Sequence, residues 1–269
     1  MSRAPGDIGP TLATRWIIGT LVGVIFAIPL VSTLLYTLQD ADGALTLDHW
    51  VSLFSAANPS VIKPLTAGLG NSLVLAVVTV VIVIVLLAPT MILVNLRFPG
   101  MKAVFEFIAL LPISIPAIVV VVGLTPIYLQ IGRTLGTGAW TLAFAYGVTV
   151  LPFAYRSIQA SIDAVDLRTL TEASRSLGAN WPTVFVTVLV PNLRSGLLAA
   201  SLISIAVVLG EFTIASLLNR QVLQTALVVV GKIDPYASAI FTLLALTFCF
   251  LLLLALGFAA RGRSRKARS

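Results

Sequence analysis

The sequence predicts an all-α protein that crosses a membrane several times. Hydrophobic residues make up 58% of its 269 residues and charged residues only 10%, and the mean hydropathy is +1.05. Soluble domains are about half apolar and about a quarter charged, so this composition excludes an ordinary soluble domain. Apolar segments of about 20 residues, the length that a helix needs to cross the hydrocarbon core, recur along the chain.

Six of these segments are predicted to span the membrane, within a single permease-like domain of residues 1–269. They lie near residues 16–38, 71–94, 104–128, 139–158, 195–218 and 237–260. The fourth is interrupted by Tyr146, Thr149 and Pro152, but without it the polar segment that follows would face the other side of the membrane. The first is longer than the apolar core of a cleaved signal peptide, so we expect an uncleaved anchor.

The basic residues predict the orientation of the spans. With both termini in the cytoplasm, 13 of the 17 Lys and Arg residues face the cytoplasm, and Lys63, Arg133, Arg220 and Lys232 face outward. Cytoplasmic loops of membrane proteins carry the excess of Lys and Arg. We therefore expect cytoplasmic N- and C-termini. The net charge of +7 is attributed to topology signals and lipid headgroup contacts, and not to nucleic-acid binding.

Residues 161–194 are the one long polar stretch inside the chain. The stretch contains Glu172-Ala173-Ser174, then Gly178 after three residues, and later Val188 and Val190-Pro191. This spacing resembles the EAA loop of binding-protein-dependent ABC importer permeases. Three residues depart from the usual pattern, with Ser174 for the second Ala, Val188 for Ile and Val190 for Leu. All three are mild replacements in size and polarity.

The resemblance implies a permease subunit of a type I ABC importer in a bacterial inner membrane, closest to the spermidine/putrescine-type permeases. In that family the loop, here residues 159–194, docks into a groove of an ATPase subunit and transmits ATP-driven closure to the spans. The residues implied in this coupling are Glu172, Ala173, Ser174, Gly178 and Pro191. The implied partners are an ATPase dimer that binds ATP and Mg²⁺, a second permease subunit, identical or homologous, and an external solute-binding protein.

The same stretch carries local signals for two helices that meet at a sharp turn. Asp163 and Asp166 suit the first turn of a helix, where the helix dipole favours negative charge. Gly178 is placed to end that helix, and Asn180 can cap a second helix with Pro182 in its first turn. One stripe of the first helix contains Leu167, Leu170, Ser174 and Leu177. We expect a rigid knob, and an ordinary cytoplasmic helical hairpin is the alternative.

The chain has no motif for hydrolysing ATP itself. Around the Gly231-Lys232 pair, Ala226 replaces the first glycine of a phosphate-binding loop and Ile233 replaces its hydroxyl residue. The sequence also has no catalytic triad arrangement and no cluster of metal ligands. We therefore expect a transport subunit without enzymatic activity, cofactor or metal of its own.

The energy for transport is expected to come from a partner ATPase or, in the alternative, from an ion gradient in a secondary transporter or channel subunit. The EAA-like loop favours the ATPase.

Three residues are candidates for the translocation path. Glu211 lies in the predicted fifth span, where a carboxylate costs about 2.5–3.5 kcal/mol, so it is expected to face the bundle interior, a water-filled path or a neighbouring chain. A substrate contact and a packing contact are both open for it. Pro112 and Pro116 interrupt the hydrogen bonds of the predicted third span. This is similar to the kinked third span of polyamine-type permeases, and a kinked packing helix is the alternative.

The expected substrate is a small cationic or polar metabolite of the polyamine type. The expectation depends on Glu211 as a negative partner, on the proline-broken third span and on the compact six-span chain. Similar permeases move ferric ions, phosphonates and oxyanions.

The outer loop, residues 39–70, predicts a short surface helix that begins after Thr46. This helix would anchor at the membrane interface or contact the binding protein. His49 is expected to be solvated, and Cys249 to behave as a small apolar side chain in the last span.

Overall fold

The computed structural model describes residues 11–40, 42–54 and 59–266, and within them every regular element is helical. The first half contains α1 Leu12–Thr37, α2 Asp48–Phe54, α3 Pro59–Ile82, η1 Val83–Leu87, α4 Ala88–Arg97, η2 Pro99–Met101, α5 Lys102–Leu110, η3 Leu111–Ser114 and α6 Ala117–Thr134. The second half contains η4 Ala139–Leu142, α7 Ala143–Asp163, α8 Leu167–Ser176, α9 Trp181–Thr183, η5 Val184–Leu189, α10 Val190–Asn192, α11 Arg194–Gly210, α12 Thr213–Leu217, α13 Leu223–Gly231 and α14 Pro235–Lys266. The all-α prediction is confirmed.

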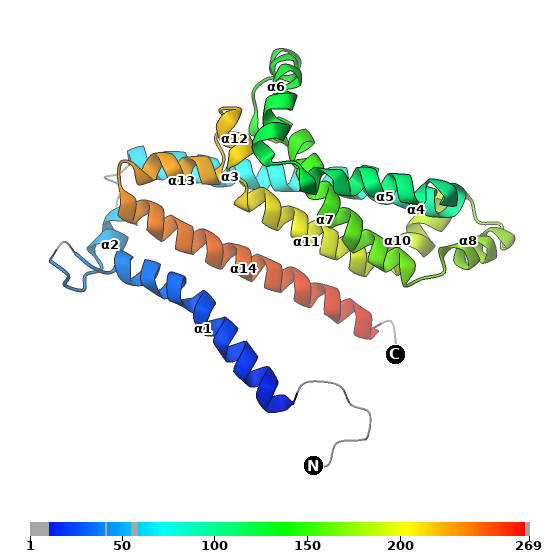
Figure 1. Ribbon diagram of the computed structural model, residues 1–269, viewed down its shortest axis with the longest axis horizontal. Helices are drawn as coiled ribbons and strands as arrows, with labels where there is room; N and C mark the ends of the chain where they lie inside the picture. The colour runs from blue at the N-terminus through cyan, green and yellow to red at the C-terminus, as the bar shows by residue number, and fades with distance from the viewer. Residues whose placement is uncertain (1–10, 41, 55–58, 267–269) are drawn as a thin grey trace.

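The long helices run along one axis of the molecule. Figure 1 shows α3, α7, α11 and α14 in this direction, and α7 and α3 both pack against α11. α6 lies crosswise to them, α8 lies at one end of the bundle, and α2 and α13 lie at the other end. α1 meets α14 near α2 and diverges from it toward its own N-terminal end.

Length and composition identify fewer membrane spans than the six predicted. Four helical stretches among the described residues qualify, namely Leu12–Thr37, Pro59–Arg97, Ala117–Thr134 and Pro235–Leu252, and a bent pair that ends at Gly210 would make a fifth. α7 is long enough, with 21 residues, but is not in this set because polar residues such as Gln159 interrupt its apolar surface. The molecule is an all-α, multi-pass membrane protein.

Two predicted spans are broken in the structure. The third, near 104–128, is interrupted at Ile115, whose extended backbone (φ −104°, ψ 121°) separates η3 from α6. Extended backbone is favoured before a proline, and Pro116 follows. The fifth, near 195–218, ends as a helix at Gly210 and does not continue through Glu211.

The basic residues Arg3 and Arg268, which were counted for the predicted orientation, lie outside the described residues.

The predicted surface helix of the outer loop is present as α2. The N–H of Asp48 donates to Oγ1 of Thr46 at 3.1 Å, and the indole N–H of Trp50 donates to Oγ1 of Thr37 at 3.1 Å, which ties α2 to the end of α1. The expectation of a solvated histidine is wrong, because the His49 ring stacks on Tyr236 with centroids 3.8 Å apart. α2 therefore packs on α1 and α14 through aromatic side chains.

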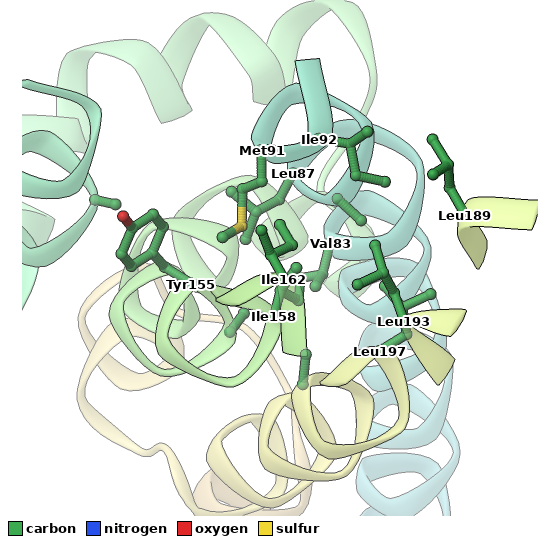
Figure 2. Packing of buried hydrophobic residues seen from close by; sticks show 14 of the residues in the cluster. Val83, Leu87, Met91, Ile92, Tyr155, Ile158, Ile162, Leu189, Leu193 and Leu197 are labelled. Atoms are coloured by element: carbon green, nitrogen blue, oxygen red, sulfur yellow. The ribbon is translucent and has the colours of Figure 1, made fainter. Parts of the chain in front are cut away.

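One buried apolar cluster joins the long helices near α8. Figure 2 shows Met91 and Ile92 of α4 beside Ile158 and Ile162 of α7. The same cluster contains Leu193, which is fully buried between α10 and α11. Interiors packed in this way transmit displacements because they leave few voids.

α11 and α7 approach each other closely at Gly196. A Cβ placed there would lie 2.5 Å from Cβ of Ser161 and 2.7 Å from the carbonyl oxygen of Ser157. Only glycine fits this crossing without moving a backbone. Small residues at helix crossings are typical of membrane bundles, where close backbone approach supplies the packing energy.

Candidate functional site: the knob and the helix ends that hold it

The knob is the segment of residues 164–193, with α8 and the short helices that follow it. α8 begins after Asp166, whose Oδ1 accepts a hydrogen bond from the N–H of Thr169 at 3.1 Å. Asp166 is therefore the cap of the helix, and the Thr169 hydroxyl and N–H lower the pKa of its carboxyl group. The prediction that Asp163 belongs to this helix is wrong, since Asp163 is the last residue of α7. The predicted loop 159–194 accordingly starts later.

Gly178 ends α8 as predicted. Its φ is +86°, which is the left-handed region that only glycine adopts without steric cost. The N–H of Gly178 donates to the carbonyl of Arg175 at 2.9 Å, and the N–H of Ala179 donates to the carbonyl of Ser174 at 3.2 Å. These two bonds form a Schellman motif, which satisfies carbonyls at the helix end and fixes the direction of the next residues.

The second helix of the knob starts immediately after this turn. Oδ1 of Asn180 accepts a hydrogen bond from the N–H of Thr183 at 3.0 Å, and Pro182 lies in the first turn, both as predicted. The helix continues through η5, which is π-helical, to Asn192, and α11 then leaves at an angle of 75°. Pro191 lies just before this bend, where its missing N–H weakens the helix.

The outer surface of the knob is apolar at its tip. The predicted stripe holds only in part: Leu167 is buried, whereas Leu177 is 89% exposed. Trp181 is 47% exposed, with the Arg175 guanidinium 5.3 Å from its ring centroid. Leu177 and Trp181 thus leave apolar side chains uncovered at the tip of the knob.

Of the three coupling candidates on α8, Glu172 and Ala173 are exposed and Ser174 is half-buried. Nε of Arg168 donates to Oε1 of Glu172 at 2.9 Å, one helical turn away. Ala173 is exposed, and Ser174 bonds back to the carbonyl of Leu170 at 2.7 Å. Glu172 thus presents a paired carboxylate beside two small residues, which leaves room for a partner surface to approach closely.

A polar network holds the ends of α4, α5 and α7 beside the knob. Gln159, only 7% exposed, exchanges amide hydrogen bonds with Asn95 at 3.2 and 3.3 Å and donates to Oδ1 of Asp163 at 2.8 Å. Lys102 donates to the same oxygen at 3.0 Å. Burial alone would raise the pKa of Asp163, but the bonds from Lys102 and Gln159 outweigh it and lower this pKa. The sequence analysis missed Asn95 and Gln159, although an amide within an apolar span is itself a signal of a buried partner.

Glu211 has a structural role that the sequence did not predict. Its carboxylate accepts hydrogen bonds from the N–H of Thr213 at 2.9 Å and of Ile214 at 3.0 Å, and so caps α12. The buried Tyr146 hydroxyl lies 3.4 Å from the Glu211 carbonyl and donates to it. Glu211 therefore holds the break between α11 and α12 against α7, and its negative charge is directed at backbone N–H groups.

Pro112 and Pro116 mark the other break in the bundle. Pro112 begins the single turn η3, and Pro116 precedes the first residue of α6. η3 packs against α7, which also contacts Glu211 through Tyr146. The three path candidates thus lie at two helix breaks, and α7 contacts both of them.

A helical membrane bundle with a capped knob at one end, joined to the spans by a packed core, is consistent with a membrane transport subunit. Residues 92–267 match the family model of the binding-protein-dependent transport system inner membrane component. This match covers more than half of the chain, so the chain belongs to that family, the permeases of ABC importers.

Three relatives illustrate the range of the family. The chain is 34% identical over 137 residues to sulfate permease 2, chloroplastic, of Chlamydomonas reinhardtii, covering 47% of this chain and 37% of that protein. It is 33% identical over 134 residues to the molybdenum transport system permease protein ModB of Escherichia coli K12, covering 45% and 56%. It is 28% identical over 123 residues to the spermidine/putrescine transport system permease protein PotC of Haemophilus influenzae, covering 46% of each chain. The matches thus span about half or less of these relatives.

Proposed function

We propose that the chain is the permease subunit of an ATP-driven importer, and that it docks onto a partner ATPase through the knob. The observation that carries this is the tip of the knob: Leu177 is 89% exposed next to the Gly178 turn. The base of the knob is buried, since Leu167 and Val184 belong to the same apolar cluster as the ends of α4, α7 and α11. A displacement of the tip would therefore be transmitted to α4, α7 and α11.

The proposed partners follow from the same arrangement. ATP and Mg²⁺ are bound by a dimer of ATPase subunits on the cytoplasmic side, where the knob and both termini lie. A second permease subunit, identical or homologous, completes the path, and an external binding protein delivers the solute. The exposed apolar surface of α1, on which only Thr37 is buried, faces lipid or this second subunit.

An ion-gradient transporter with Glu211 as its proton or cation site is not favoured. The family match supports an importer, and both Glu211 oxygens accept bonds from the backbone of α12. The same geometry removes Glu211 as an argument for a cationic solute. The relatives are named for sulfate, molybdenum and spermidine/putrescine transport. Only one of these three names supports the expectation of a polyamine solute.

Co-purification and transport test this proposal together. A nucleotide-binding subunit should co-purify with the chain when the chain is isolated from its native membrane. The reconstituted complex should take up solute when ATP is supplied and should continue in the presence of an uncoupler. Uptake that stops with the uncoupler and proceeds without ATP would show that an ion gradient drives the protein.

A further inference from the structure

A basic pocket lies at the end of the bundle away from α8, where α12, α13 and the turn between them meet (Figure 1). The pocket has a volume of about 470 Å³. Its polar lining includes Ser216, Asn219, Arg220, Gln221 and Lys232. We call it the Arg220 pocket. The positive-inside pattern predicts that Arg220 and Lys232 face outward, which is the side from which an importer receives solute.

The backbone fixes the position of Arg220. Asn219 is the one described residue other than glycine with a positive φ, 51°. The N–H of Asn219 donates to the carbonyl of Ser216 at 3.1 Å, and the N–H of Arg220 donates to the carbonyl of Ala215 at 2.8 Å. This Schellman motif ends α12 and defines where the next residue lies. The carbonyl of Arg220 in turn accepts a bond from the hydroxyl of Thr225 at 3.1 Å, so both sides of its peptide unit are held.

The guanidinium of Arg220 is partly desolvated and forms no ion pair with any residue that the structure describes. Its Nε is buried and has no hydrogen-bond partner. A Cβ added at Gly132 would lie 3.9 Å from its Nη2, so the group lies against α6. Among the described residues, the ion pairs are Lys102–Asp163 and Arg168–Glu172, and neither includes Arg220. A positive group removed from water without a partner is costly, and an anion would offset that cost.

The charged residues that line the pocket are both positive. None of the described residues that line it is Asp or Glu. The nearest carboxylate in sequence, Glu211, directs its oxygens to the N–H groups of Thr213 and Ile214. Lys232 adds a second positive charge to the lining. A planar guanidinium with several N–H donors matches the spaced oxygens of an oxyanion, and charge-assisted bonds of this kind are among the stronger ones.

We propose that the Arg220 pocket binds a small oxyanion, of the class of sulfate, molybdate or phosphate, at the outward end of the bundle, and that this is the class of solute that the permease accepts. The proposal rests on the importer function proposed above. Arg220 holds the anion through its guanidinium, Lys232 adds a second charge, and the hydroxyl and amide groups of the rim take part in orienting it.

The test is equilibrium binding of radiolabelled sulfate, molybdate and phosphate to the full chain in lipid nanodiscs. At least one of the three should bind saturably. Arg220→Gln should weaken that binding about 10- to 100-fold, the loss that corresponds to a bond with a charged group, and Arg220→Lys should weaken it less. Arg133→Gln is the matched control, because Arg133 is an exposed cation next to Gly132 that is not in the lining and should leave affinity near wild type.

Several results would overturn the proposal. They are the absence of saturable binding for all three anions, equal binding by Arg220→Gln and wild type, and displacement of the bound anion by spermidine. If Arg220→Gln keeps its anion binding but loses association with an external binding protein, the pocket is a docking surface for protein carboxylates and the proposal is wrong. The importer function fails on a separate measurement, the absence of an ATPase subunit from the purified complex, which anion binding does not affect.

Discussion

Gly178 and Asn219 end their helices with the same hydrogen-bond motif and the same left-handed backbone. Gly178 could be predicted from the sequence, because glycine after a helical stretch is the commonest signal for this ending. Asn219 could not, since asparagine is equally common in caps, turns and exposed loops. The turn of the knob at Gly178 was therefore predictable, and the turn at Asn219, which positions Arg220 in its pocket, was not.

Gly178→Asp should uncouple ATP hydrolysis from transport and leave the spans folded. A side chain in the left-handed region costs about 1–2 kcal/mol, and this cost falls on the turn next to Leu177, the side chain proposed to contact the ATPase. Stimulation of the partner ATPase by solute and binding protein is the measurement. Gly136→Asp is the control, because Gly136 has φ +82° and open space around it, as Gly178 does, but lies away from the knob. Equal coupling in both variants would contradict the role of the knob.

Glu211→Gln should lower thermal stability and leave solute selectivity unchanged. The carboxylate caps α12 through two N–H groups, and Gln keeps one acceptor oxygen while its NH2 group cannot accept. The variant should therefore lose part of the about 0.5–2 kcal/mol that such a cap contributes. Unfolding of the detergent-purified chain, followed by fluorescence, measures the first effect, and competition among solutes measures the second. A variant of wild-type stability that has lost only cation uptake would restore Glu211 as a substrate contact.

Helices were predictable as elements, and their interruptions were not. The apolar runs predicted α1, α3 and α14 because a spanning helix requires a long apolar segment. The break at Ile115 was read as a kink, because the effect of two prolines depends on where the next helix can pack. The end of α11 at Gly210 is accompanied by local capping bonds of Glu211 and by the bond from the Tyr146 hydroxyl, which joins segments 65 residues apart in the chain.

Gly196→Ala should destabilise the crossing of α7 and α11. The added methyl group would meet Ser161 Cβ at 2.5 Å and the Ser157 carbonyl at 2.7 Å, so one backbone must move, at a cost of about 1–3 kcal/mol. Gly210→Ala is the matched control on the same helix, since no atom lies within 4 Å of its Cβ position. Melting temperatures of the two variants in one detergent are the measurement. If both melt like wild type, the crossing is looser than the structure indicates.

At the scale of the whole molecule, the bundle separates two kinds of surface. One end carries the knob, with the network of Asn95, Gln159 and Asp163 at its base, and the other carries α2 and α13 (Figure 1). The Arg220 pocket lies between α12 and α13. Sequence predicted the class of protein and the position of the knob, since the polar stretch of residues 161–194 is local. It could not predict the Arg220 pocket, because Gly132 of α6 approaches Arg220 only through the crosswise packing of α6.

The orientation of these two ends in the membrane is the last prediction. The distribution of Lys and Arg places the knob in the cytoplasm and α2 outside. On a Cys249→Ala background, which removes the single cysteine, Ser176→Cys should react with a membrane-impermeant maleimide only in inverted vesicles. Leu45→Cys, at a side chain that is 75% exposed, should react only in intact spheroplasts. Each variant serves as the control for the other, because one reagent is applied from both sides. Labelling of Ser176→Cys in intact spheroplasts would place the knob outside, where no ATPase could reach it, and the proposed coupling would fail with the topology.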